Sequence, residues 1–147
     1  MILVVGHGPS AQVDPEWVDA QDLVVRLFTT PRPHPRGAYN PSVGSRIDVI
    51  VTTRPKNIFP GIEFWLESDY REIIREMVNP QRKLSTGTVA CLIARHKYPE
   101  EEIGVIGFDT TLRGWNLDVW VYHDALAERK MLEEIGVKDC GARYEDQ

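Results

Sequence analysis

Cysteine is scarce in this chain, and the residue types that hold metals lack the spacing of a ligand set. The 147 residues include two cysteines, Cys91 and Cys140, and four histidines, which are not arranged like the ligands of a zinc site. No Asp-x-Asp pair of the kind that holds a catalytic cation occurs. We therefore expect no metal cofactor and no oxidising compartment. Because Cys91 lies inside an apolar run, we expect it to be a buried small hydrophobe.

The chain also has fewer basic than acidic residues, and its apolar runs are short. The 17 Lys and Arg residues are outnumbered by 22 Asp and Glu residues, and the formal net charge is -5. A protein that binds the nucleic-acid backbone usually needs a basic face, so this balance argues against nucleic acid as the main partner. No run is long enough to cross a bilayer. The opening apolar residues 1–5 meet glycine and proline at once, unlike a signal peptide. We expect no membrane partner and a cytoplasmic protein, whereas the sequence says nothing of its oligomeric state.

Short apolar runs alternate with amphipathic ones along the chain, as in a β/α protein. The length, with 42% hydrophobic and 27% charged residues, fits one globular domain over residues 1–147. Apolar runs predict strands at 2–6, 23–25, 47–52, 62–66, 103–108 and 119–121. The spacing of apolar residues predicts helices at 15–20, 70–78, 86–96 and 124–135. Ser68 and Asp69 are the expected caps of the helix at 70–78. Prolines predict a loop over 29–45. The expected fold class is α/β, a Rossmann-like single domain with a mostly parallel sheet and helices on both faces.

Polar residues and glycines follow the predicted strands, where a doubly wound sheet binds its ligands. Gly6 and Gly8 lack Cβ atoms, which would let the backbone approach a ligand, and Ser10 can donate to phosphate or ribose. A plain tight turn is the alternative for the glycines. Asp109 directly follows the strand at 103–108 and would reach a nucleotide at the carboxyl edge. A loop aspartate that accepts backbone amides is an equally good interpretation of Asp109.

Ser85, Thr86 and Gly87 place hydroxyls and a glycine at the start of a predicted helix. A helix start presents four amides without intrahelical partners and a partial positive charge, which together attract an anion such as a phosphate. A simple N-cap by Ser85 or Thr86 is the alternative interpretation, and it is compatible with anion binding. This segment is therefore the strongest candidate in the sequence for nucleotide binding.

His123 is the best candidate for acid–base chemistry. It lies just before a predicted helix, where the helix start disfavours a positive charge, so a neutral imidazole that can accept a proton is expected. Five residues on, Glu128 would point elsewhere if both residues were helical. Glu128 then either braces a neighbouring loop or belongs to a solvated face. Arg46 and Asp48 are two apart in a predicted strand, share a side, and are expected to form a structural ion pair.

The same segments occur in an order that resembles a known family. They are VVGHGPS at 4–10, DLVVRLFTTP at 22–31, VGSRIDVIV at 43–51, STGTVACLIA at 85–94, VIGFD at 105–109 and YHDALAERKMLEEIG at 122–136. Together they resemble the large, small and very small motifs of the sialyltransferases, glycosyltransferase family 29. The very small motif is a histidine, four residues and a glutamate, which are His123 and Glu128 here. The resemblance spans nearly the whole chain.

The resemblance implies a metal-independent, inverting glycosyltransferase that moves a sugar from a CMP-activated donor to an acceptor hydroxyl. The partner would be a nucleotide or nucleotide-sugar, and no cofactor would be needed because the CMP-sugar is the donor substrate. His123 would be the general base, with Glu128 and Arg46 in support. The expected nucleotide-binding residues are Gly6, Gly8, Ser10, Ser85, Thr86, Gly87 and Asp109.

Three departures from the family pattern keep a second function open. His7 and Phe28 stand where the family has asparagines, and both replacements remove amide hydrogen-bonding capacity. A further histidine-aromatic motif has no clear counterpart. These departures favour a non-catalytic nucleotide-binding or regulatory module on the same fold. A nucleoside-modifying or nucleoside-cleaving enzyme on a similar sheet is a third possibility. The retained His123 and the Ser-Thr-Gly segment favour the transferase, which ranks first. The transferase interpretation requires the glycine bend, Thr86 and His123 to share one crevice.

Overall fold

The fold is built on a parallel sheet in which the first strand of the chain lies inside the sheet. The computed structural model describes residues 1–28, 44–52, 61–114 and 123–142. These residues form a six-stranded sheet in the order β4-β3-β2-β1-β5-β6, and each neighbouring pair is parallel. The strands are β1 (Ile2–Val5), β2 (Leu23–Phe28), β3 (Val49–Thr52), β4 (Glu63–Leu66), β5 (Ile103–Ile106) and β6 (Lys138–Asp139).

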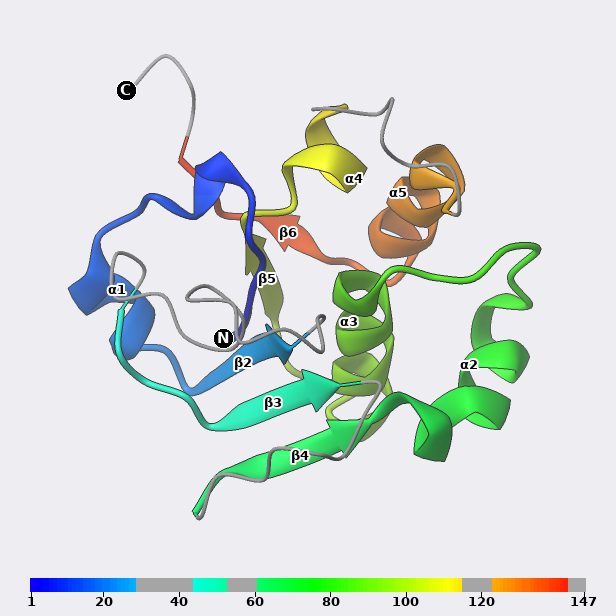
Figure 1. Cartoon of the computed structure of the whole chain (residues 1–147), viewed down its shortest axis with the longest axis horizontal. Helices are drawn as coiled ribbons and strands as arrows, with labels where there is room; N and C mark the ends of the chain where they lie inside the picture. The colour runs from blue at the N-terminus through cyan, green and yellow to red at the C-terminus, as the bar shows by residue number, and fades with distance from the viewer. Residues whose placement is uncertain (29–43, 53–60, 115–122, 143–147) are drawn as a thin grey trace.

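Helices cover both faces of the sheet, which explains why its inner strands are largely apolar. Ile2 and Val4 belong to the core on the side of α3 (Thr86–Lys97), whereas Leu3 and Val5 belong to the core on the side of α1 (Pro15–Asp19). Helices α2 (Arg71–Val78) and α5 (Ala125–Glu134) lie on the α3 side (Figure 1). Successive residues of a strand point to opposite faces, so both must be apolar when both faces are covered. The predicted α/β fold class is confirmed.

Capping residues near the helix ends explain where α5 begins and ends, whereas the caps predicted for α2 need a correction. The Asp124 carboxylate accepts from the amide of Ala127 at 3.0 Å to cap α5, and Gly136 follows the helix with φ 79°. The predicted caps Ser68 and Asp69 are wrong. Residues 67–70 instead form a 3-10 turn, η2 (Glu67–Tyr70), and α2 then begins at Arg71 without a side-chain cap. None of the helices in the described ranges is both long and apolar enough to cross a membrane.

Two short elements have no signal in the sequence. Helix α4 (Asp109–Arg113) and strand β6 have five and two residues, too few to show a periodic pattern. A further 3-10 turn, η1 (Pro9–Ala11), follows β1. The predicted strand at 119–121 and most of the predicted 29–45 loop lie outside the described residues.

The chain reverses its direction across the sheet next to β1. After β1 it adds β2, β3 and β4 on one side, and it then returns through α2 and α3 to place β5 on the other side of β1. The carboxyl ends of β1 and β5 therefore flank a topological switch point. Ligands of open α/β sheets bind in the crevice at such a point.

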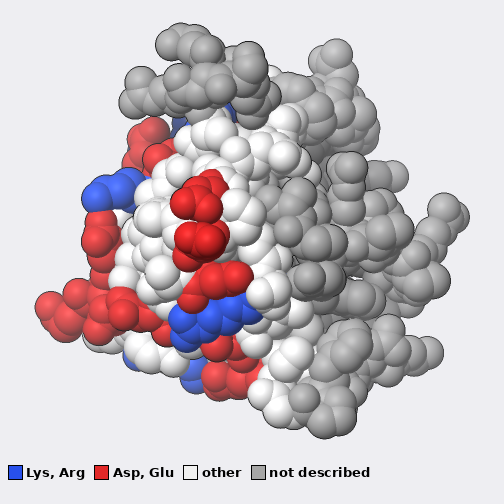
Figure 2. All heavy atoms as spheres, turned by 90° about the vertical axis from the view of Figure 1, so that its left-hand side faces the viewer, with Lys and Arg blue, Asp and Glu red and all other residues white. Residues whose placement is uncertain are grey.

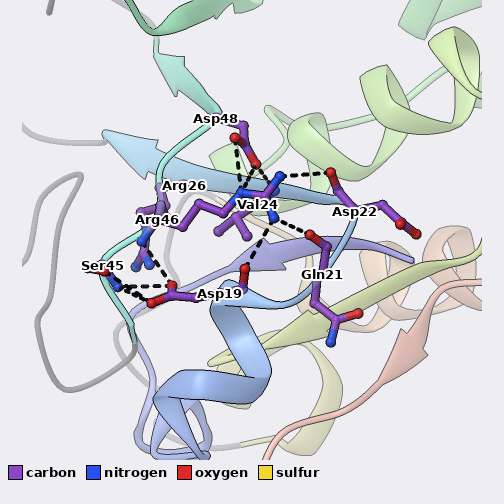
Figure 3. A network of polar contacts seen from close by, with 8 residues as sticks. All are labelled: Asp19, Gln21, Asp22, Val24, Arg26, Ser45, Arg46 and Asp48. Atoms are coloured by element: carbon purple, nitrogen blue, oxygen red, sulfur yellow. Dashed lines mark hydrogen bonds and ion pairs between the residues drawn. The ribbon is translucent and has the colours of Figure 1, made fainter.

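Arg46 ties the amino ends of β2 and β3 to the end of α1 (Figure 3). Its Nη1 donates to the carbonyl oxygens of Asp19, at 3.1 Å, and of Gln21. Its Nη2 donates to the carbonyl of Asp22 at 3.0 Å, and its Nε lies 2.9 Å from Asp48 Oδ2. The predicted Arg46–Asp48 ion pair is confirmed, and the arginine also satisfies three backbone carbonyls.

The Asp19 carboxylate completes this network from the other side. It accepts from the amides of Ser45, at 3.0 Å, and Arg46, at 2.9 Å. Burial acts to raise the pKa of Asp19, but the hydrogen bonds from Arg46 and Ser45 outweigh it and hold the pKa below its usual value. Gly44 makes the approach possible, because a Cβ there would lie 2.5 Å from Asp19 Oδ1 and φ is 90°. The segment from Gly44 to Arg46 is therefore a structural clamp.

We predict that Arg46→Met lowers the free energy of unfolding by about 1–2 kcal/mol, because three carbonyls and one carboxylate lose a donor. Urea denaturation measures the loss. Arg75→Met is the matched control, since Arg75 is exposed on α2 and its replacement should cost less than about 0.5 kcal/mol. Equal losses for the two variants would contradict the clamp.

Candidate functional site

A crevice of about 260 Å³ opens at the switch point. Its walls come from the exits of β1 and β5, the end of β2, and the starts of α3 and α4. The lining residues are Gly6, His7, Gly8, Leu27, Ser85, Thr86, Gly87, Gly107, Phe108, Thr110 and Thr111. Two of the three groups expected to meet, the glycine bend and the Ser-Thr-Gly helix start, therefore share one crevice.

The glycines at the β1 exit allow a close approach between two strand exits. A Cβ on Gly6 would lie 2.6 Å from the carbonyl oxygen of Gly107, and a Cβ on Gly8 would lie 2.1 Å from Asp109 Oδ2. Real Cβ atoms essentially never come this close. We expect these glycines to make room for a ligand, but their main constraint is packing against the neighbouring strand exit. They are required because the β5 exit occupies the space that their side chains would fill.

Ser10 and Asp109 lie beneath the crevice and are not among the residues that line it. Both are fully buried. The Asp109 carboxylate accepts from the amide of Ser10 at 3.1 Å and from its hydroxyl at 2.8 Å, and the Ser10 hydroxyl accepts from the amide of Gly107 at 3.0 Å. The expectation that Ser10 and Asp109 contact a nucleotide is thus corrected, because their polar groups bond to each other. The alternative, an aspartate that accepts backbone amides, describes Asp109 better.

The start of α3 is left without a side-chain cap. Ser85 occupies the N-cap position, but its hydroxyl bonds to none of the helix amides and donates to Glu128 Oε1 at 2.5 Å instead. The alternative interpretation, a simple side-chain cap by Ser85 or Thr86, is therefore wrong. Thr86 and Gly87 line the crevice, and the amides of this first turn have no carbonyl partner within the helix. The helix start keeps its capacity to bind an anion.

Glu128 holds the Ser-Thr-Gly segment in place from α5. It is 1% exposed, and its Oε1 accepts from the amide of Ser85 at 3.2 Å and from the hydroxyls of Ser85 and Thr88 at 2.5 Å each. Among the described residues, Oε2 has no hydrogen-bond partner. Of the two predicted roles, the brace is confirmed and the solvated face is wrong.

His123 is attached to the same segment through the backbone. Its Nδ1 lies 2.7 Å from the carbonyl oxygen of Lys83, two residues before Ser85. A carbonyl only accepts, so the contact places a proton on Nδ1 and the neutral ring carries its lone pair on Nε2. His123 precedes the Asp124 cap of α5 and is half-buried. It is not among the residues that line the crevice, so the expectation that all three groups share one lining is wrong. The contact with Lys83 nevertheless places His123 beside the Ser85 end of the crevice and not on a separate face of the molecule.

Arg46, expected to support the site, lies elsewhere. It binds the carbonyls that precede β2, at the amino edge of the sheet, whereas the crevice opens at the carboxyl edge. Several lining residues were not predicted as site residues, namely His7, Leu27, Gly107, Phe108, Thr110 and Thr111. The two threonines belong to α4, which has no sequence signal of its own. Phe108 ends a predicted strand, and its place in the lining follows only from the turn at Gly107, where φ is 74°.

Two solved structures share this architecture. One is a mammalian sialyltransferase in complex with Gal-beta-1-3GalNAc-ortho-nitrophenol, with a TM-score of 0.64 and 13% identity, and the match covers 97% of this chain and 69% of that chain. The other is also a mammalian sialyltransferase, with a TM-score of 0.60, 14% identity and the same coverage of both chains. The chain has a sialyltransferase-like fold. No family model matches the sequence, and no curated protein matches it.

This likeness concerns the fold, because a shared fold does not imply a shared reaction. At 13% to 14% identity, the function has to be argued from the crevice itself. The sialyltransferase-like fold does agree with the family resemblance of the motifs, which rests on different observations.

We predict that Glu128→Ala lowers the free energy of unfolding by about 2–3 kcal/mol, since three buried or half-buried donors lose a charged acceptor. Glu128→Gln keeps an oxygen acceptor and should cost about half as much. Chemical denaturation compares the two variants. Glu133→Ala, at an exposed position on the same helix, is the control and should change little. If Glu128→Ala behaves like Glu133→Ala, Glu128 is not a brace.

Proposed function

We propose that the protein is a glycosyltransferase that moves a sugar from a CMP-activated donor to an acceptor hydroxyl, with inversion at the sugar carbon and without a metal. The observation that carries the proposal is the crevice at the switch point, with an uncapped helix start on one wall and two glycine-containing strand exits on the others. The sialyltransferase-like fold supports the same conclusion.

The start of α3 would hold the phosphate of the donor. Its first-turn amides and the positive end of the helix dipole favour an anion, and the hydroxyl of Thr86 adds a donor beside Gly87 in the lining. Leu27 and Phe108 give the crevice apolar walls suited to the ring faces of a nucleoside. Because α3 has 12 residues packed against four strands of the sheet, this helix start is held in a fixed position.

His123 would take the proton from the acceptor hydroxyl. In the tautomer set by the Lys83 carbonyl, the Nε2 lone pair of the neutral ring is the proton acceptor. The acceptor oxygen then forms its bond to the anomeric carbon of the donor while the bond from that carbon to the phosphate oxygen breaks. CMP leaves with the electron pair, and the start of α3 stabilises the charge on its phosphate. The reaction leaves a protonated imidazole, CMP and the new glycoside.

We predict that CMP binds the crevice more tightly than UMP, UDP, CDP or GDP, and that Gly87→Ala weakens CMP binding by about tenfold, near 1.4 kcal/mol. The added Cβ would lie 2.8 Å from Phe108 Cζ in the crevice wall. Isothermal titration calorimetry measures the affinities, and circular dichroism confirms that the variant is folded. Unchanged affinity in Gly87→Ala would place CMP outside this crevice.

We predict that His123→Gln lowers turnover of a CMP-sugar by about 10²- to 10⁴-fold, the usual contribution of a general base, with little change in CMP affinity. His96→Gln is the matched control, because His96 is an exposed histidine at the far end of α3. Release of CMP from CMP-sialic acid measures turnover, with Gal-beta-1-3GalNAc-ortho-nitrophenol, the ligand in the similar structure, as the first acceptor. Equal turnover in both variants would remove His123 from the chemistry.

The second candidate is a nucleotide-binding module without transfer activity. His7 is exposed and lines the crevice where the family has an asparagine, which favours this second function. Such a module would bind CMP without consuming any CMP-sugar, whatever acceptor is supplied. A nucleoside-cleaving enzyme would instead release free base in the same assay.

A further inference from the structure

A second cavity, of about 330 Å³, lies between α2 and the segment at 80–84. Four cationic side chains line it: Arg71 and Arg75 from α2, and Arg82 and Lys83 from the following segment. Among the described residues of the lining, Glu67 supplies the one acidic side chain. Such a concentration of positive charge is unexpected in a chain of net charge -5. On the described part of the face that carries α1, acidic side chains cover more of the surface than basic ones (Figure 2).

The four cations are not neutralised by the part of the fold that the structure describes. Within residues 61–114 and the other described ranges, none of their side chains forms a hydrogen bond or an ion pair, whereas Arg46, Arg113 and Lys138 each pair with a carboxylate. Cationic side chains around one concave surface focus a positive potential and attract an anion. Arginines also bind carboxylate, sulfate and phosphate groups through two parallel hydrogen bonds.

Glu67 restricts the class of ligand that suits this cavity. Its Oε2 is buried without a hydrogen-bond partner among the described residues, although buried polar atoms are normally hydrogen-bonded. A carboxylate oxygen would repel a bare anion but would accept a hydrogen bond from a hydroxyl. A carboxylate in the lining beside four cations therefore suits a molecule that carries both a negative group and hydroxyls, as an acidic sugar does.

The cavity lies next to the proposed reaction site. Lys83, which lines it, also supplies the carbonyl that holds His123, and Leu84 lines it directly before Ser85 of the nucleotide crevice. We propose that this cavity is an acceptor subsite for an acidic saccharide, with the cations on its carboxylate, sulfate or phosphate group and Glu67 on a hydroxyl. Its role as an acceptor subsite rests on the proposed function, whereas its binding of an acidic sugar does not.

Binding is tested on the full chain without any donor. Glucuronic acid is the probe, galactose the neutral control, and inorganic sulfate the anion without hydroxyls, each followed by NMR titration. We predict saturable binding of glucuronic acid, with shifts at residues 71–84, and weakening by about tenfold in Arg75→Gln/Arg82→Gln, since two charge-assisted hydrogen bonds are lost. Lys130→Gln, an exposed cation on α5 outside this lining, should bind as the wild type does.

Glu67→Leu separates a sugar site from a simple anion site. Removing a negative charge should tighten sulfate binding, while glucuronic acid should not gain in the same way because it loses the acceptor for its hydroxyl. Three results would overturn the proposal: no saturable binding of glucuronic acid, equal gains for both ligands, or no difference between the double variant and Lys130→Gln. CMP affinity in the same variants should stay unchanged. A failure of this subsite is thus distinguishable from a failure of the nucleotide crevice.

Discussion

The contact between the exits of β1 and β5 is the constraint on which the rest of the site depends. Gly6 and Gly107 approach so closely that neither backbone leaves room for a Cβ on the other. The buried Ser10–Asp109 pair fixes this arrangement, because Ser10 bonds both to the Asp109 carboxylate and to the amide of Gly107. The crevice is the space left above this contact. Its shape therefore follows first from backbone packing and only then from the side chains that line it.

A second support acts on the other wall of the crevice. Glu128 lies on α5, far along the chain from the helix start that it holds, and its carboxylate takes the Ser85 hydroxyl that would otherwise cap α3. Because that hydroxyl is committed to Glu128, the first-turn amides of α3 are left for a ligand. One buried carboxylate thus serves both the fold and the proposed anion site. His123 lies directly before α5, so the same helix carries the brace and the proposed base.

The sequence predicts the elements of this fold better than it predicts their contacts. The apolar runs that become β1, β3 and β5 are each buried on both faces, so composition alone is enough to recognise them. The Arg46–Asp48 pair is equally local. The role of Asp109 depends instead on Ser10, a residue 99 positions away. The same holds for Glu128, whose partners Ser85 and Thr88 become neighbours only when α5 packs against α3. Long-range pairings of this kind have no periodic signal in one sequence.

The strand order also affects how the chain can fold. Strand β1 is hydrogen-bonded to β2 on one side and to β5 on the other, and roughly a hundred residues separate β1 from β5. During synthesis, therefore, β1 keeps one edge without a partner until residues 103–106 have left the ribosome. An apolar strand with an open edge is a template for pairing with other chains. Pairing with β5 is consequently the step that removes this open edge from the folding chain.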